Sequence, residues 1–168
     1  MAPKPAKDLR LTCQCGGVEY RVSGPPILGA VCHCDDCREA AVQLGRLSGA
    51  DPLRDTEGGT PCILFRKDQV TCLKGQERLR DHRLDPGSPT RRVIASCCDT
   101  PMFLDYEKGH WFSVYRARLG RDAPPVQMRI QTGGTSRRPA GPLPSYPGYP
   151  PVFMLKLTLA RLAMMIGR

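Results

Sequence analysis

Seven of the nine cysteines in this 168-residue chain stand in three short clusters. In chain order the clusters are Cys13 with Cys15, then Cys32, Cys34 and Cys37, then the adjacent pair Cys97 and Cys98. Closely spaced cysteine thiolates are ligands that zinc prefers in proteins, and thiols persist where the surroundings are reducing. The clusters therefore predict a protein that binds one or two Zn²⁺ ions per chain.

The three cysteines of the middle cluster predict a different kind of zinc site from the other four. Three protein ligands leave one tetrahedral position open, and an open position distinguishes catalytic zinc from structural zinc. With three thiolates the centre carries a formal charge of −1, so it activates water poorly and suits an added thiol instead. The first and third clusters are expected to share a structural site.

Composition supports this interpretation over a disulfide framework. A chain of 168 residues can bury a core of ordinary size, and nine cysteines is an odd number for a closed disulfide set. Residues 1–12 lack the apolar stretch of roughly 7 to 15 residues that a signal peptide needs, so the expected location is the cytoplasm.

The elements that must position the cysteines are mostly short strands. Residues 9–22 alternate apolar and polar side chains around a Gly-Gly turn, which predicts a hairpin, and residues 27–32 form an apolar run that predicts a strand ending at Cys32. A short helix should follow at 36–44, with Asp36 as its cap and Glu39 completing a capping box. Residues 46–60 are expected to form a loop anchored by Leu47 or Leu53.

The rest of the chain predicts an antiparallel β core and a C-terminal helix. The expected strands are residues 62–65, 70–73, 77–84, 91–96 and 111–115. The proline- and glycine-rich segment 121–151 is predicted to be extended or partly disordered, and 1–10 to be a flexible basic tail. The prediction is thus a mainly β domain over 11–120.

Residues 152–168 predict a helix that is apolar nearly all round, interrupted by Lys156 and Arg161. Fifteen helical residues span about 22 Å, less than the roughly 30 Å of a bilayer core, so no transmembrane segment is expected. The helix is expected to dock on the β core or to form a homodimer contact, with contact to a lipid surface as a further alternative.

Four sequence motifs resemble one known zinc-protein family. They are the CxC of Cys13 and Cys15, the SGPP of residues 23–26, the CHCDDCR of residues 32–38 and the CCDTP of residues 97–101. Together they resemble the glutathione-dependent formaldehyde-activating enzyme family, which includes centromere protein V, over residues 11–102. The resemblance implies a β-tent fold with two zinc sites.

The resemblance assigns the cysteines residue by residue, with two departures. Cys13, Cys15 and Cys98 match the family's structural site, and residues 32, 34 and 37 match its second, open site. The family's remaining structural cysteine falls on Ala95, and the glycine after Cys98 is an aspartate. Cys97 could supply the missing ligand only if the backbone turns there, since adjacent strand residues point to opposite faces.

The function implied by the resemblance is carbon–sulfur lyase chemistry of the S-(hydroxymethyl)glutathione synthase type. A small thiol such as glutathione would bind at the open zinc and be added to, or released from, a small aldehyde such as formaldehyde. The segment 39–45, after the motif, differs from the family's small-residue segment, and it is expected to shape the thiol pocket.

Two other functions remain open from the residues alone. The net charge of +9 allows a non-catalytic zinc-stabilised module that binds nucleic acid or a protein through a basic face. The ten aromatic residues do not interleave with a basic stripe, which argues against nucleic acid. Alternatively, the three-cysteine site could act as a redox or metal sensor.

Several further residues receive structural predictions only. Cys62 and Cys72 are expected to be inert core thiols, and His33 to face away from the ligands on either side of it. The arginine run is expected to be a solvated sheet face; its members are Arg78, Arg80, Arg83, Arg91 and Arg92.

Overall fold

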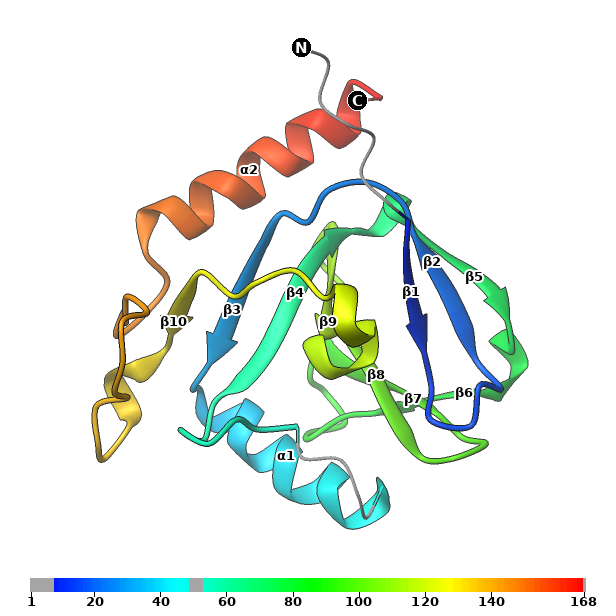
Figure 1. The fold of residues 1–168 in the computed structure, drawn as a ribbon, viewed down its shortest axis with the longest axis horizontal. Helices are drawn as coiled ribbons and strands as arrows, with labels where there is room; N and C mark the ends of the chain where they lie inside the picture. Colours follow the sequence, from blue (N-terminus) through cyan, green and yellow to red (C-terminus); the bar gives the residue numbers. More distant parts are fainter. Residues whose placement is uncertain (1–7, 49–52, 168) are drawn as a thin grey trace.

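The computed structural model describes residues 8–48 and 53–167, which form two β-sheets and two main helices (Figure 1). The smaller sheet has the order β1-β2-β5, with bounds Leu9–Thr12, Glu19–Val22 and Val70–Lys74. The larger sheet has the order β10-β3-β4-β9-β8-β7-β6. Its strands are β3 (Leu28–Cys32), β4 (Thr60–Arg66), β6 (Leu79–His82), β7 (Thr90–Ala95), β8 (Thr100–Tyr106), β9 (Trp111–Tyr115) and β10 (Met128–Ile130).

Strand pairing is antiparallel except between β10 and β3, so the predicted mainly β, mostly antiparallel class is confirmed. The two main helices are α1 (Asp35–Ser48) and α2 (Pro151–Met165). Short 3-10 turns occupy Lys67–Gln69, Gln76–Arg78, Arg116–Asp122 and Thr132–Gly134.

The two sheets pack face to face through a first apolar core. Leu11 and Val22 of the small sheet and Phe65 and Met102 of the large sheet are fully buried in it. The ring of Tyr20 on β2 meets that of Phe103 on β8 edge to face, with 5.4 Å between centroids. This contact and the apolar burial around it hold the sheets together.

A second apolar core lies on the opposite face of the large sheet, because successive residues of a strand point to opposite faces. On β4, Ile63 and Phe65 enter the first core, whereas Cys62 and Leu64 enter the second. From α2, Phe153 packs into this second core. The large sheet is therefore covered on both faces, with the small sheet on one side and α2 on the other (Figure 1).

Helix α1 is longer than predicted and begins earlier. It starts at Asp35, so Asp36 lies in its first turn and is not the cap. The predicted capping box is wrong, because Glu39 accepts a hydrogen bond from Gln43 one turn later on the exposed face. Gly45 does not end the helix, since the buried Leu44 anchors this part of it against the second core.

The predicted loop 46–60 is accordingly shorter at its N-terminal end, and residues 49–52 of it lie outside the described part of the chain. Leu53 is buried as an anchor, whereas Leu47 is exposed. Of the predicted N-terminal tail, residues 1–7 lie outside the described part, and Leu9 and Arg10 already belong to β1.

Three strand predictions need correction. Segment 77–84 is a 3-10 turn followed by β6 alone, and β8 was not predicted because Pro101 interrupts its pattern. The segment 121–151, predicted to be extended or partly disordered, contributes the unpredicted strand β10. The buried Arg129 on this strand donates to the carbonyls of Leu143 and Ala140 in the same segment, at 3.0 and 2.5 Å.

Helix α2 begins at a proline, as predicted, and docks on the second core through Phe153 and Leu157. Its outward side chains are largely apolar and exposed. Within the described ranges, neither this helix nor any other is long and apolar enough to cross a membrane.

Asp105 offers a test of how buried ion pairs stabilise the large sheet. This buried carboxylate on β8 pairs with Lys67 at 2.7 Å and with Arg91 at 2.7 Å. Replacing it with alanine removes the carboxylate partner of Lys67 and one of the two carboxylate partners of Arg91, so D105A is expected to lower the free energy of unfolding by about 2 to 3 kcal/mol. Urea denaturation measures this change.

The matched control is Asp68, which pairs with Arg66 at the exposed surface. The D68A variant is expected to change the free energy of unfolding by about 1 kcal/mol or less, because exposed ion pairs contribute little. Equal losses in the two variants would contradict a special role for Asp105.

Candidate metal centres and the cavity beside them

The first candidate metal centre brings together the four cysteines predicted for the structural site. Their sulfurs all lie within 4.8 Å of one another. The Sγ–Sγ distances are 3.7 Å for Cys13–Cys15, 3.8 Å for Cys13–Cys97 and 3.3 Å for Cys15–Cys97. Tetrahedral zinc with Zn–S bonds of about 2.3 Å needs sulfurs about 3.8 Å apart, so this donor set fits the ion.

The backbone turn that Cys97 and Cys98 require is present between β7 and β8. Residues 96–99 form this turn, and Asp99 adopts a positive φ of 53°. Aspartate tolerates this left-handed conformation better than most residues, which accounts for its place where the family has glycine. The Arg80 guanidinium donates to its carboxylate at 2.8 Å.

Ala95 stands at the end of β7 and is fully buried in the first core. The position that the family uses for a ligand is therefore an apolar core position in this chain. The sulfur of Cys97, two residues later, lies in the cluster instead. Its role as the fourth ligand stays a prediction, and the turn at residues 96–99 removes the geometric objection to it.

The second candidate centre forms where β3 meets α1. Cys32 ends the strand, Cys34 lies in the connection and Cys37 lies in the first turn of the helix. The three sulfurs lie within 4.8 Å of one another, with 3.4 Å between those of Cys32 and Cys34. The backbone N–H of Cys37 donates to the sulfur of Cys34 at 3.4 Å.

The three thiols lie so close together that, without a metal ion, each one changes the pKa of its neighbours. Hydrogen bonds with Cys32 and Cys37 lower the pKa of Cys34, and hydrogen bonds with Cys32 and Cys34 raise the pKa of Cys37. Three sulfurs this close cannot all be negatively charged unless a cation lies among them. A divalent soft cation would replace the shared protons, so the donor set fits zinc.

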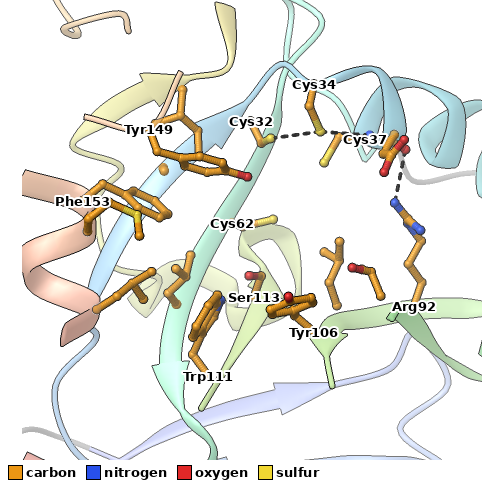
Figure 2. A pocket seen from close by; sticks show the side chains of 18 residues that line it. Cys32, Cys34, Cys37, Cys62, Arg92, Tyr106, Trp111, Ser113, Tyr149 and Phe153 are labelled. Atoms are coloured by element: carbon orange, nitrogen blue, oxygen red, sulfur yellow. Dashed lines mark hydrogen bonds between the residues drawn. The ribbon is translucent and has the colours of Figure 1, made fainter. Parts of the chain in front are cut away.

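A cavity of about 420 Å³ adjoins the second cluster, and Cys32, Cys34 and Cys37 all line it. Figure 2 shows the sulfurs along one wall, with Tyr149 and Phe153 at one end of the cavity and Arg92 at the other. Trp111, Ser113 and Tyr106 line the wall opposite the sulfurs, and Met154 and Leu157 also contribute. The four-cysteine cluster does not line this cavity.

The prediction for Arg92 as part of a solvated arginine face is wrong. Its side chain is only 2% exposed and lines the cavity. Arg91 points to the other face of β7 and pairs with Asp81 and Asp105, so the alternation of the strand carries the next residue inward. Sequence reasoning treated the arginines as one group and missed this difference.

Tyr149 was also missed, because it lies in the proline-rich segment that showed no periodic pattern. Its phenol oxygen points toward the cysteine sulfurs in Figure 2. Burial, and then the nearby sulfurs of Cys32, Cys34 and Cys37, raise its pKa to about 12. The phenol therefore stays protonated at neutral pH and remains a hydrogen-bond donor.

The remaining polar candidates lie outside the second cluster. Cys62 is buried in the cavity wall, and burial raises the pKa of its thiol. Cys72 is half-buried on β5, away from the cavity. His33 is buried, does not line the cavity and has a pKa lowered by desolvation, so it is neutral at pH 7.

Elemental analysis can test the two centres separately. Protein purified without chelator is expected to hold two zinc ions per chain, and the C32A/C34A/C37A variant one, because the clusters share no ligand. C97A should weaken the other site, whereas C72A, the matched control, should retain both ions. One zinc ion in both the wild type and the triple variant would show that the second cluster binds none.

Comparisons with known proteins match this chain to one family model. No curated protein matches the chain. A crystal structure of a Rhodobacter sphaeroides protein, a structural-genomics target, aligns with a TM-score of 0.49 and 16% identity, over 82% of this chain and 99% of that one. The family model for the glutathione-dependent formaldehyde-activating enzyme matches residues 8–129, which contain both cysteine clusters and the whole of the predicted motif set. The chain therefore belongs to the glutathione-dependent formaldehyde-activating enzyme family.

Proposed function

We propose that this protein binds a small thiol at an open three-cysteine zinc site and adds it to, or releases it from, a small aldehyde. One observation carries the proposal: the three-cysteine cluster opens onto a cavity, whereas the four-cysteine cluster does not. An open ligand position beside a cavity is what a catalytic site needs, and a closed four-thiolate set is typical of a structural site. Family membership supports the same chemistry.

Zinc held by three thiolates supplies a position at which an added thiol loses its proton and is held as a nucleophile. In the addition, a carbon–sulfur bond forms, the carbonyl π bond breaks and the thiol proton ends on the former carbonyl oxygen. The release reverses each of these changes. The reaction is thus balanced without an oxidant or reductant.

The residues of the cavity have separate roles in this proposal. Tyr149 donates a hydrogen bond to the oxygen on which charge develops, since its phenol is protonated and directed at the sulfurs. Trp111 and Phe153 form apolar walls that exclude water from the reacting atoms. Cys37 lies in the first turn of α1, where the helix dipole favours its thiolate.

Three further attributes belong to the proposal. We infer that the two sheets are the β-tent of this family, that the resident metal is Zn²⁺ and that the protein acts in the cytoplasm. The cysteine clusters and the family match support the first two. A reducing compartment, which keeps the nine cysteines as thiols, supports the third.

The alternative of a module that binds through a basic face receives less support. Arg80, Arg83 and Arg91 each pair with a carboxylate of this chain, so much of the arginine charge is already compensated. A sensor role for the three cysteines would require the second site to be empty in part of the population. The elemental analysis described above would then give fewer than two zinc ions per chain.

We also propose that α2 mediates a homodimer. Five exposed apolar residues follow one another on its outer side at alternating spacings of three and four, namely Val152, Leu155, Leu159, Leu162 and Ile166. This spacing is that of the a and d positions of a coiled coil, with β-branched residues at both ends. A second copy of the same helix complements such a stripe, which is why a second copy is the proposed occupant.

Exchange spectroscopy with ¹³C-formaldehyde can test the chemistry. The wild type is expected to accelerate the exchange between free formaldehyde and its thiol adduct, and C34A to abolish the acceleration. Y149F should lower the rate about 100-fold, because one positioned proton donor typically contributes that much. Y146F, whose phenol does not line the cavity, should retain the rate. Equal rates in Y149F and the wild type would remove Tyr149 from the mechanism.

Sedimentation equilibrium can test the homodimer. The wild type is expected to form a dimer that L155E/L162E converts to a monomer, because each glutamate would lie in the apolar seam. T158E, on the flank of the seam, should have a much smaller effect. A monomeric wild type that binds vesicles containing anionic lipid would contradict the dimer and favour a lipid surface as the occupant.

A further inference from the structure

Arg92 is a buried cation without a carboxylate partner. It is 2% exposed, and its Nη2 donates to the backbone carbonyl of Asp36 at 3.2 Å. Its Nε has no hydrogen-bond partner, and its guanidinium also interacts with the phenol of Tyr115. Within residues 8–48 and 53–167, no carboxylate forms an ion pair with it, whereas Arg91 beside it pairs with two.

A guanidinium in this position needs an anion, because burial of an unpaired charge costs several kcal/mol. The thiolates of the second cluster supply part of the compensation, and the positive charge of Arg92 helps to lower the pKa of Cys34. The Nε–H of Arg92 nevertheless has no acceptor from the protein, and the acceptor of its Nη2 is an uncharged backbone carbonyl. A carboxylate matches the guanidinium fork with two parallel hydrogen bonds.

Apart from the cysteines and the hydroxyls of Thr90 and Ser113, the rest of the cavity is mostly apolar or aromatic. Among the described residues, Arg92 is the one basic residue that lines it and Asp36 the one acidic residue. Glutathione carries two carboxylates and an ammonium group, which is more charge than this lining can pair. The wall formed by Trp111, Tyr149 and Phe153 instead matches an apolar body between the sulfur and the charged end of a ligand.

The aromatic end of the cavity belongs to this chain and not to the part that the family model describes. The family match ends at residue 129, whereas Tyr149, Phe153, Met154 and Leu157 come later and line the cavity. Residues 149–157 therefore add a wall to the pocket beside the three-cysteine cluster. Ligand selectivity follows from this added wall together with Arg92.

We infer that the thiol ligand of this protein is an apolar or aromatic thiol with a single carboxylate, that Arg92 binds the carboxylate, and that the C-terminal wall selects the apolar body. The inference rests on the proposed function for the sulfur end of the ligand. The carboxylate subsite itself is argued from the burial of Arg92, its place in the cavity wall and its unpartnered Nε, so the two can be tested apart.

Titration of cobalt-substituted protein provides the first test. A thiolate that binds Co²⁺ adds a sulfur-to-metal absorption band, which yields a dissociation constant without an assay of activity. The probes are 3-mercaptopropionate, 6-mercaptohexanoate and 4-(mercaptomethyl)benzoate, each paired with its primary amide, together with glutathione. The probes differ in the distance between their thiol and their carboxylate, so that at least one can span the separation between the cysteine sulfurs and Arg92.

At least one carboxylate probe is expected to bind the wild type about tenfold more tightly than its amide, and more tightly than glutathione. The variant R92Q should lose this preference, while its affinity for the amide stays within about twofold of the wild-type value. R83Q, which removes an arginine that pairs with Glu107, is the matched control and should keep the preference. No preference in the wild type, or equal losses for carboxylate and amide in R92Q, would overturn the inference.

Calorimetry with a ligand that lacks sulfur separates the inference from the proposed function. 4-Methylbenzoate is expected to bind the zinc-loaded wild type, and 4-methylbenzamide and the R92Q variant to show no binding. If no thiol changes the cobalt spectrum but 4-methylbenzoate still binds through Arg92, the proposed function fails and the subsite stands. If thiols bind without preference for a carboxylate, the function stands and the subsite fails.

A folding control keeps the test decisive. If R92Q does not fold, R92K replaces it, because lysine keeps the charge but loses the two parallel hydrogen bonds. R92K is then expected to weaken the best carboxylate probe about threefold or more and to leave its amide unchanged. Equal weakening of both probes would assign Arg92 to the fold or the metal centre and overturn the inference.

Discussion

Repulsion between closely placed thiolates, relieved by a bound cation, is the constraint on which the rest of this structure depends. The four-cysteine cluster joins the hairpin of the small sheet, through Cys13 and Cys15, to the β7–β8 turn of the large sheet. The three-cysteine cluster joins the end of β3 to the start of α1. A cation bound at each cluster would therefore fix how the sheets and the helix lie around the two apolar cores.

The same strands that build the cores also build the cavity, because alternation sends neighbouring residues to opposite faces. Arg91 joins the ion pairs at one face of β7, and Arg92 enters the cavity on the other. On β4, Phe65 packs between the sheets while Leu64 lines the cavity. Charge and apolar surface thus meet beside the sulfurs on strands of the sheet, and Tyr149 and the first turns of α2 complete the cavity.

Features with a local signal were predictable from the sequence, and features that depend on distant partners were not. The hairpin at residues 9–22 and strand β9 follow from alternation, and the cysteine groups follow from spacing. Strand β10 has three residues and forms because β3 offers an edge, which no local pattern reveals. Arg92 and Tyr149 could not be identified as site residues from the sequence, because only the folded chain places them in the cavity wall. Their sequence neighbours are ordinary strand and loop residues.

The second cluster stays open for a reason that can be traced to the register of β3 and β4. Cys32 pairs with Thr60, so Cys62 lies two residues along on the same face and faces the cavity. Its sulfur nevertheless lies outside the group of three that are all within 4.8 Å. Burial also raises the pKa of the Cys62 thiol, and a protonated thiol is a poor zinc ligand. A shift that brought this sulfur into the cluster would close the site, so the placement of one strand separates an open centre from a structural one.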